Sequence, residues 1–304
     1  MKVAFLFPGQ GSEVARVGAP WLERSQPSRE LLEGAARHVS LDVRGLFAAG
    51  GRALERTEVQ QPALTALCLG IHAELLARRV RPDIVAGHSL GEVAACAAAG
   101  AMGAKDAVAL AAVRGRLMAR EAARYPGGML AVTAEGRGVA EAALDLAREH
   151  GLAAIAAHNA PEQWVIAGDW PALRAVAARY STTHVPVAGP WHTEAMAGAV
   201  DEFREAARGA VRGTLTAALV ANRTGACVTD ARELPDLLAG QFTHPVEWDA
   251  TMRTISAAGV SDLVVLGPGK ALRGLARRGL PAAVRLHAAE LPEDLDAIGE
   301  ALAR

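Results

Sequence analysis

The sequence is short of cysteine and of net charge, and each shortage excludes a class of protein. Its three cysteines, Cys68, Cys96 and Cys227, lie far apart in a chain of 304 residues. Their spacing matches neither a disulfide framework nor a zinc site, which favours a reducing compartment. Thirty-two Lys and Arg residues against 33 Asp and Glu residues leave a net charge of −1. A chain without an overall positive charge has no general field that would attract nucleic acid or an anionic membrane, so we expect neither as a partner. The cysteine spacing likewise leads us to expect no metal.

Long apolar runs are also missing. The longest uncharged stretches cover residues 59–73 and 93–104, below the roughly 18 residues that cross a bilayer. Only Val3–Phe7 is apolar before Pro8 at the N-terminus, whereas a secretory signal needs roughly 7–15 apolar residues. These features predict a cytoplasmic protein, for which a monomer is the default expectation.

Apolar residues as a class are abundant, at 51% of the chain, which is enough to build a large core. Short runs typical of buried strands recur at residues 3–7, 83–87, 215–222 and 263–266. Segments suited to helices lie between them, at residues 29–37, 63–80, 90–99 and 105–123. Pro62 is expected in the first turn of the helix over 63–80. The alternation predicts an α/β body with a mainly parallel sheet.

A different pattern begins near Pro126. Strands are expected at residues 127–133, 153–157, 164–167 and 182–187, with helices at 139–149 and 171–180. This β-α-β-β-α-β order is typical of a ferredoxin-like unit. We therefore predict a ferredoxin-like small subdomain over residues 124–188, inserted into a catalytic body made of residues 1–123 and 189–304.

The strongest local signal is Gly87-His88-Ser89-Leu90-Gly91, a G-x-S-x-G pattern between an expected strand and an expected helix. In that context the glycines allow a sharp turn that lifts the serine hydroxyl above the sheet, as in the nucleophile elbow of α/β-hydrolase-like folds. The following helix points its first amides, starting with Leu90, at an incoming carbonyl. The body is therefore expected to be α/β-hydrolase-like, with Ser89 as candidate nucleophile. The alternative is an ordinary strand–helix turn.

A serine nucleophile needs a base, and the chain has nine histidines. His192 lies in a loop after the strand expected at 182–187, a place where catalytic bases are often displayed. From the residues alone, His192 is one candidate among several. His88 neighbours Ser89 inside the elbow and is expected to shape the pocket.

Seven short motifs are spread in order from residue 5 to about residue 275. They are Phe7-Pro-Gly-Gln-Gly-Ser12, Gly87-His-Ser-Leu-Gly-Glu92, Arg114-Gly-Arg-Leu-Met118, Val165-Ile-Ala-Gly168, Trp191-His-Thr-Glu-Ala-Met196, Pro245-Val-Glu-Trp248 and Gly267-Pro-Gly-Lys270. Together they resemble the malonyl-CoA:acyl-carrier-protein transacylase family. One such motif would be a weak signal, but seven in the family's order are a strong one.

The resemblance implies how the site is built. Ser89 would carry the acyl group as an ester, and His192 would act as general base and acid. Gln10 and Leu90 would supply backbone N–H groups to the oxyanion hole. Gln241 matches the position whose backbone carbonyl orients the histidine, in place of the acid of a usual triad.

Arg114 is implied to bind the free carboxylate of the malonyl group, and it follows Ser89 by the family's spacing of 25 residues (114 − 89). A planar, permanently charged fork in an apolar helix suits bidentate pairing with a carboxylate. The alternative is a structural ion pair with Glu92. Trp191 is expected to narrow the space beside the acyl α-carbon and so favour malonyl over methylmalonyl groups. The alternative there is a packing residue that points away.

The implied reaction moves a malonyl group from malonyl-CoA to the phosphopantetheine thiol of an acyl carrier protein, without a metal or nucleotide cofactor, in fatty-acid or polyketide synthesis. Because the chain shows no carrier-protein or ketosynthase segment, we expect a discrete enzyme that acts in trans. Two basic clusters are candidates for docking an acidic carrier, or are only solvated faces. They are Lys270, Arg273, Arg277 and Arg278, and Arg78, Arg79 and Arg81. The alternative function is an acyl hydrolase on the same scaffold.

Overall fold

Two five-stranded sheets organise the chain. The structure is a computed structural model that describes residues 1–303, apart from the side chains of residues 49 and 50. The first sheet has the order β10-β9-β1-β2-β7 and all its strands are parallel. Its strands are β1 (Val3–Phe7), β2 (Ile84–Gly87), β7 (Ala218–Val220), β9 (Asp262–Leu266) and β10 (Arg285–Ala289). The central three are buried along their whole length, as parallel strands covered on both faces must be.

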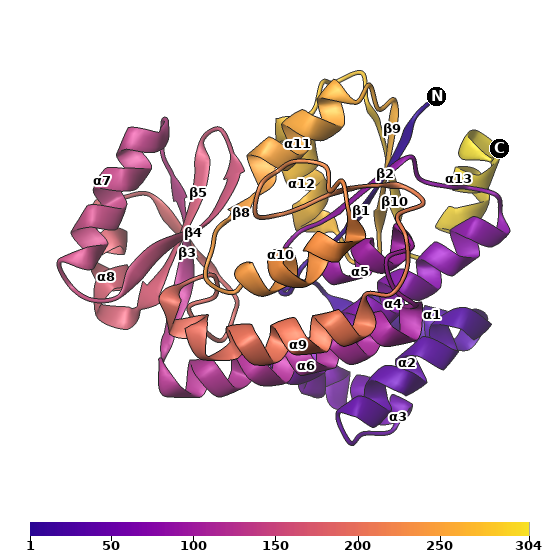
Figure 1. The fold of residues 1–304 in the computed structure, drawn as a ribbon, viewed down its shortest axis with the longest axis horizontal. Coiled ribbons are helices and arrows are strands. Elements are labelled where there is room, and N and C mark those ends of the chain that lie inside the picture. The colour runs from indigo at the N-terminus through magenta and orange to yellow at the C-terminus, as the bar shows by residue number, and fades with distance from the viewer. Residues whose placement is uncertain (304) are drawn as a thin grey trace.

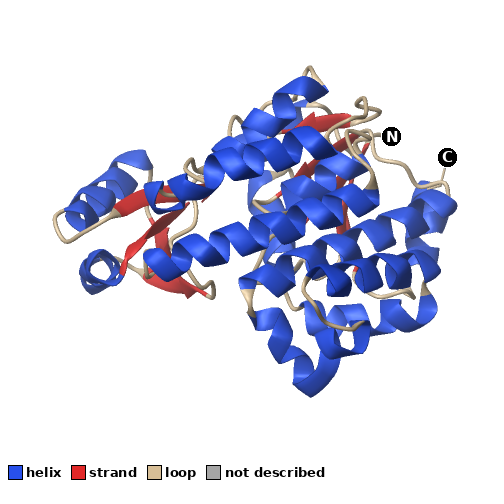
Figure 2. Cartoon of the chain, turned by 60° about the horizontal axis from the view of Figure 1, so that its bottom comes forward, coloured by secondary structure: helices blue, strands red, loops and turns tan. Residues whose placement is uncertain are grey.

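Helices enclose this sheet, as Figure 2 shows. They are α1 (Val14–Arg24), α2 (Gln26–His38), α3 (Val43–Phe47), α4 (Thr57–Ala77), α5 (Gly91–Ala98), α6 (Ala104–Arg124), α9 (Val200–Ala210), α10 (Leu234–Gly240), α11 (Trp248–Ala257), α12 (Lys270–Gly279) and α13 (Asp294–Leu302), with short 3₁₀ segments η1 (Ala48–Glu55), η2 (Glu194–Ala199) and η3 (Ala231–Glu233). The long helices α6 and α9 lie side by side and extend toward the second sheet (Figure 1). None of the helices in residues 1–303 is both long and apolar enough to cross a membrane.

The second sheet forms a separate small layer, and its part over residues 127–185 is drawn in magenta and pink in Figure 1. Its order is β6-β3-β5-β4-β8. Its strands are β3 (Gly127–Thr133), β4 (Ala153–Ala160), β5 (Gln163–Asp169), β6 (Thr182–Val185) and β8 (Val246–Glu247), and its helices are α7 (Arg137–Arg148) and α8 (Trp170–Arg179). The first four strands are antiparallel and follow the predicted β-α-β-β-α-β order. The strand β8 comes from the body and pairs parallel with β4.

The two faces of the small sheet serve different purposes. On β3, Leu130 and Val132 pack into a core under α7 and α8. The alternate residues Met129 and Ala131 face the other way and line a cavity on the side of the body. This is the period of two expected for a strand, and it makes the small subdomain one wall of that cavity.

The predicted fold class is confirmed, but several predicted elements differ in extent, and two of these differences have a clear physical cause. The helix expected over 63–80 begins at Thr57, so Pro62 lies inside α4 rather than in its first turn. An interior proline costs a helix about 3 kcal/mol, and burial of α4 on almost every side outweighs that cost. The strand expected over 215–222 is limited to β7, because the Thr216 N–H donates to the carbonyl of Ala99 outside the sheet.

Candidate active site

Ser89 lies at a sharp turn between β2 and α5. Its backbone is left-handed, with φ of 51°, a conformation that a non-glycine residue adopts only where the surroundings hold it. The flanking glycines are required by close contact. A Cβ at Gly87 would lie 2.0 Å from the backbone of Gly91, and one at Gly91 would lie 2.1 Å from the carbonyl oxygen of Phe7. The turn is therefore a nucleophile elbow in geometry as well as in sequence.

Asn222, at the end of β7, holds this turn from below. Its Oδ1 accepts a hydrogen bond from the Ser89 N–H at 2.6 Å, and its Nδ2 donates to the carbonyl of Gly87. The Asn222 side chain is fully buried, so both bonds are shielded from water. They offset the strain of the left-handed serine.

His192 is within hydrogen-bonding distance of the serine. Its Nε2 lies 2.9 Å from Oγ of Ser89, and its Nδ1 lies 2.6 Å from the backbone carbonyl of Gln241. A carbonyl only accepts, so Nδ1 carries the proton and Nε2 is left to accept from the serine hydroxyl. Burial, followed by the nearby charge of Arg114, lowers the pKa of His192 to about 3. The imidazole is therefore neutral near pH 7 and can take a proton.

Arg114, on α6, reaches the same hydroxyl. Its guanidinium is 2% exposed and donates to Oγ of Ser89 at 3.2 Å, to Oε1 of Gln61 at 3.0 Å and to Oε1 of Gln241 at 2.6 Å. The ring of Phe242 lies 5.5 Å from the guanidinium carbon. Burial lowers the pKa of Arg114 to about 10, so the group stays charged. All three of its hydrogen-bond acceptors are neutral.

The ion pair weighed as an alternative for Arg114 is not formed. Among the described residues, Glu92 makes no salt bridge, and the amide of Gln241 lies between it and Arg114. Burial raises the pKa of Glu92 to about 7. The two groups therefore make no direct contact, although each still acts on the other through space: Glu92 raises the pKa of Arg114, and Arg114 lowers the pKa of Glu92.

The amides expected to form an oxyanion hole belong to Gln10 and Leu90. Leu90 is the residue directly before α5, and Gln10 lies in the loop after β1, where its side chain donates to Thr57 and accepts from Gln61. Within residues 1–303 neither backbone N–H donates to another group. Both therefore remain available to a ligand beside Ser89.

A cavity of about 530 Å³ opens above Ser89, between the body and the small subdomain. The body contributes Gln10, His88, Ser89, Trp191 and His192 to its lining, and the small sheet contributes Met129, Ala131 and Val165. The described residues place Arg114 against the serine hydroxyl but not in this lining. A hollow of about 900 Å³ between α1 and residues 184–188 shares Gln10 with the cavity but contains neither Ser89 nor His192.

The two remaining predicted pocket residues both line the cavity. His88 Nε2 lies 2.8 Å from Oδ1 of Asn159, and burial lowers the pKa of His88. Trp191 is buried, and a Cβ at Gly189 would lie 2.6 Å from its six-membered ring. The six-membered ring of Trp191 therefore packs closely against Gly189, and the residue also lines the cavity.

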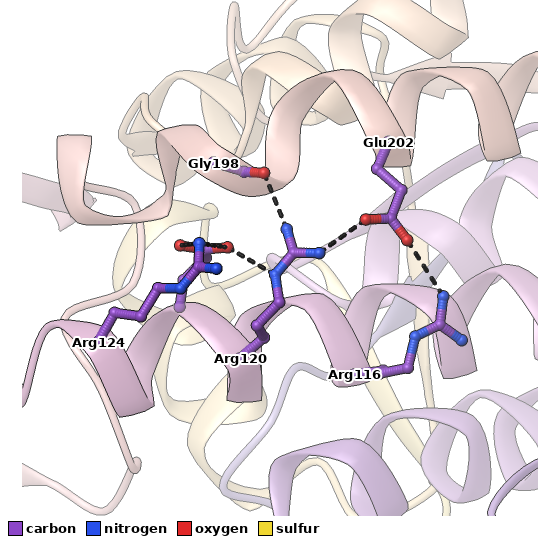
Figure 3. A network of polar contacts seen from close by, with 6 residues as sticks. Arg116, Arg120, Arg124, Gly198 and Glu202 are labelled. Carbon is purple, nitrogen blue, oxygen red and sulfur yellow. Dashed lines mark hydrogen bonds and ion pairs between the residues drawn. The ribbon is translucent and has the colours of Figure 1, made fainter.

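A polar network fastens the segment after His192 to the helix that carries Arg114 (Figure 3). Arg120 of α6 donates to the carbonyl of Gly198 at 2.8 Å and to Glu202 of α9 at 2.7 Å. Arg116 reaches the same carboxylate, and Arg120 also pairs with the buried Glu121. The network thus links η2 and α9, which follow His192 in the chain, to α6, which carries Arg114.

Known proteins resemble this chain in both sequence and structure. The acyl transferase domain model matches residues 4–240. The malonyl CoA-acyl carrier protein transacylase of Mycobacterium tuberculosis is 39% identical over 97% of this chain and 98% of that protein. The acyl-carrier-protein S-malonyltransferase structure from Bartonella henselae covers both chains completely, with a TM-score of 0.91 and 29% identity. A polyketide synthase of Streptomyces halstedii is 34% identical over 90% of this chain and 5% of its own length.

The chain belongs to the malonyl-CoA:acyl-carrier-protein transacylase family. As a member of this transacylase family it is an acyltransferase, and the predicted mixture of a parallel sheet and a second small sheet is the fold of its solved relatives.

The structure brings together every residue that the sequence analysis assigned to the site, and it adds Gln61 and Asn222. Neither was predicted, since no local pattern marks them. Gln61 lies 53 positions before Arg114, and Asn222 lies 133 positions after Ser89. Only the packing of α4 and β7 beside the elbow gives them their partners.

Proposed function

We propose that this transacylase transfers a malonyl group from malonyl-CoA to the phosphopantetheine thiol of an acyl carrier protein, by way of an ester on Ser89. The observation that carries the proposal is the meeting of a base and a cation at one hydroxyl. His192 Nε2 lies 2.9 Å and Arg114 Nη2 lies 3.2 Å from Oγ of Ser89. A buried guanidinium at the nucleophile suits an acyl group that ends in a carboxylate.

In the first half-reaction His192 Nε2 takes the proton of the Ser89 hydroxyl as Oγ attacks the thioester carbonyl. The N–H groups of Gln10 and Leu90 stabilise the oxyanion of the tetrahedral intermediate. When the intermediate collapses, the C–S bond breaks and His192 returns the proton to the sulfur of CoA. The carbonyl of Gln241 holds the imidazole in the tautomer that this transfer needs.

The second half-reaction reverses these steps with a different thiol. The phosphopantetheine thiol gives its proton to His192 and attacks the Ser89 ester, and the serine oxygen regains a proton as it leaves. One thioester replaces another, so the exchange is nearly balanced in free energy. The steps use only the side chains of this protein and its two substrates, and we propose that no metal or nucleotide cofactor takes part.

Of the two basic clusters, the one on α12 is the better candidate for carrier docking. Lys270 and Arg278 line the cavity above Ser89, and Arg277 on the same helix is exposed. Ion pairing does not separate the clusters, because Arg78 pairs with Glu74 and Asp296, and on α12 Arg273 pairs with Glu290 and Arg278 with Glu162. A carrier protein bound to α12 would lie next to the cavity above Ser89, which its phosphopantetheine arm must enter. The positive charge of this cluster is complementary to an acidic carrier protein.

Hydrolysis is the competing use of the same ester. The buried Arg114 argues for retention of a carboxylate-bearing group, and a cavity walled by Met129, Ala131 and Val165 limits access of water to the ester. Release of malonate without a carrier, as fast as transfer to one, would favour a hydrolase. The proposed reaction supplies malonyl groups for fatty-acid or polyketide synthesis.

Intact-mass measurement tests the proposal directly. Wild-type protein mixed with malonyl-CoA is expected to gain one malonyl group, and the adduct is expected to disappear on addition of a phosphopantetheinylated carrier. Ser89→Ala should gain no mass, whereas Ser12→Ala, at the loop after β1, should still be acylated. A wild-type protein that forms no malonyl adduct contradicts the proposal.

A further inference from the structure

The side chain of Gln241 occupies a position that the proposed chemistry does not use. Its backbone carbonyl orients His192, but its amide lies between two buried charged groups. Gln241 Oε1 accepts from Arg114 at 2.6 Å, and Gln241 Nε2 donates to Oε2 of Glu92 and, at 3.1 Å, to the carbonyl of Ser89. A guanidinium only donates, so this orientation of the amide is the one that its neighbours permit.

Glu92 is an unusual carboxylate for so dry a place. It is 1% exposed on α5, directly behind the elbow. Its two oxygens accept from the Asn222 N–H at 2.9 Å and from Gln241 Nε2, and no cation of the described chain touches it. A buried carboxylate close to a buried guanidinium is expected to form a direct ion pair unless a group is held between them. That group is the Gln241 amide.

The separation has a consequence for Arg114. Each of its acceptors, on Ser89, Gln61 and Gln241, is neutral. A carboxylate adds a second charge and can accept two parallel N–H bonds from the guanidinium, whereas each of the present neutral acceptors takes one bond and carries no charge. A substrate carboxylate can therefore displace the present partners, whereas it would compete poorly with Glu92 if that residue were paired with Arg114.

We propose that Gln241 is a positioning residue for carboxylate selectivity, because its side-chain amide keeps Glu92 from pairing with Arg114 and so leaves the guanidinium available to the substrate. The proposal rests on the proposed function, in which the acyl group carries a carboxylate. It assigns a second, side-chain role to a residue whose backbone already serves His192.

Gln241→Met tests this role, since methionine keeps the backbone carbonyl and the length of the side chain but has no amide. Malonyl acylation of Ser89 is expected to slow by about tenfold or more relative to wild type, the loss of one charge-assisted contact. Acylation by acetyl-CoA and labelling by phenylmethanesulfonyl fluoride, which use no carboxylate, are expected to slow much less, so that the ratio of malonyl to acetyl acylation rates falls. Gln26→Met, at an exposed site on α2, is the matched control and should change neither rate.

The double variant Glu92→Gln/Gln241→Met tests whether Glu92 is the group that competes with the substrate carboxylate for Arg114. Without the charge on residue 92, nothing draws Arg114 away, so malonyl acylation is expected to recover most of its wild-type rate. If it does not recover, or if Gln241→Met slows malonyl and acetyl groups equally, Gln241 acts only through His192 and the proposal is overturned. An unchanged malonyl rate in Gln241→Met overturns it as well.

Two further observations keep the outcomes distinct. If Gln241→Met no longer reacts with the sulfonyl fluoride, Gln241→Glu replaces it, because the new carboxylate would pair with Arg114 directly and give the same selective loss of malonyl acylation. An equal effect on both acyl groups again overturns the proposal. A wild-type protein that takes up no malonyl group refutes the proposed function itself, whereas a wild-type adduct with an unaffected Gln241 variant refutes only this inference.

Discussion

The guanidinium of Arg114 donates a hydrogen bond to Oγ of Ser89, the atom that also lies 2.9 Å from His192 Nε2. One hydroxyl thus contacts both a neutral imidazole and a buried cation. A bound carboxylate would take over the serine's place on Arg114 and leave Oγ to His192 alone. Under the proposed function, selection of the acyl group and activation of the nucleophile would therefore be linked at a single atom.

Replacement of Arg114 should change selectivity more than overall reactivity. In Arg114→Ala the preference for malonyl over acetyl groups is expected to fall by roughly 10–150-fold, corresponding to about 1.5–3 kcal/mol for a hydrogen bond to a charged group. Arg114→Lys should recover little of it, because an ammonium lacks the planar fork. Intact-mass time courses with both CoA esters measure the ratio, and a ratio that stays at the wild-type value argues against a carboxylate-binding role.

The pH dependence of acylation should reflect the buried histidine. The pKa of His192 is lowered from 6.5 to about 3 by burial, so the imidazole stays neutral well below pH 6.5. The acid limb of single-turnover malonyl acylation is expected below pH 6.5, and a midpoint at 6.5 would show that His192 is solvated like free imidazole.

The same shift contributes to stability with a definite sign. Between pH 6.5 and about 3 the unfolded chain binds a proton at His192 that the native state does not. The contribution of His192 to the free energy of unfolding therefore increases as the pH rises across that window. The same contribution decreases as the pH falls. Urea unfolding of wild type and His192→Gln at pH 5 and pH 8 measures the effect, and the variant is expected to lose less stability on acidification.

Trp191 is expected to restrict the substituent on the acyl α-carbon. Trp191→Ala should raise the rate of methylmalonyl relative to malonyl acylation by at least about tenfold, the scale at which pockets discriminate single carbon groups. Trp164→Ala removes an equally buried ring from the core of the small subdomain, outside the cavity, and should leave the ratio unchanged. Equal wild-type rates with the two esters would remove this role for Trp191.

Asn222 should matter for the elbow and not for the choice of substrate. Asn222→Ala leaves the Ser89 N–H and the Gly87 carbonyl without their buried partner. Each such group is expected to cost about 1–3 kcal/mol of stability. Acylation should slow equally with malonyl-CoA and acetyl-CoA, because the strained serine is no longer held. Urea unfolding and acylation rates check both effects, and a stable, fully active variant would contradict the assignment.

Carrier docking on α12 predicts a charge effect confined to the second half-reaction. Arg277→Glu should raise the KM for the carrier protein and weaken its salt dependence, while acylation by malonyl-CoA is unaffected. Arg79→Glu, at an exposed position just after the end of α4, is the matched control. If carrier transfer ignores both salt and the reversal at Arg277, the docking surface lies elsewhere.

Features that depend on neighbouring residues in the chain could be predicted from the sequence alone. The elbow at Ser89 follows from glycines that must lie two residues to either side of it, and the ferredoxin-like unit follows from the alternation of strand and helix patterns. Motifs in family order also pointed to Ser89, His192 and Arg114, because each lies in a recognisable short context.

The contacts between these side chains, by contrast, depend on the tertiary structure. Arg114 contacts Gln241 across 127 residues, and Ser89 contacts Asn222 across 133. Nothing in either neighbourhood encodes the partner. A direct pair between Glu92 and Arg114 was also compatible with the sequence, and the Gln241 amide that bonds to both groups excludes it. Side-chain partners in a buried network depend on the packing of elements distant in sequence, whereas turns and strands depend on neighbours along the chain.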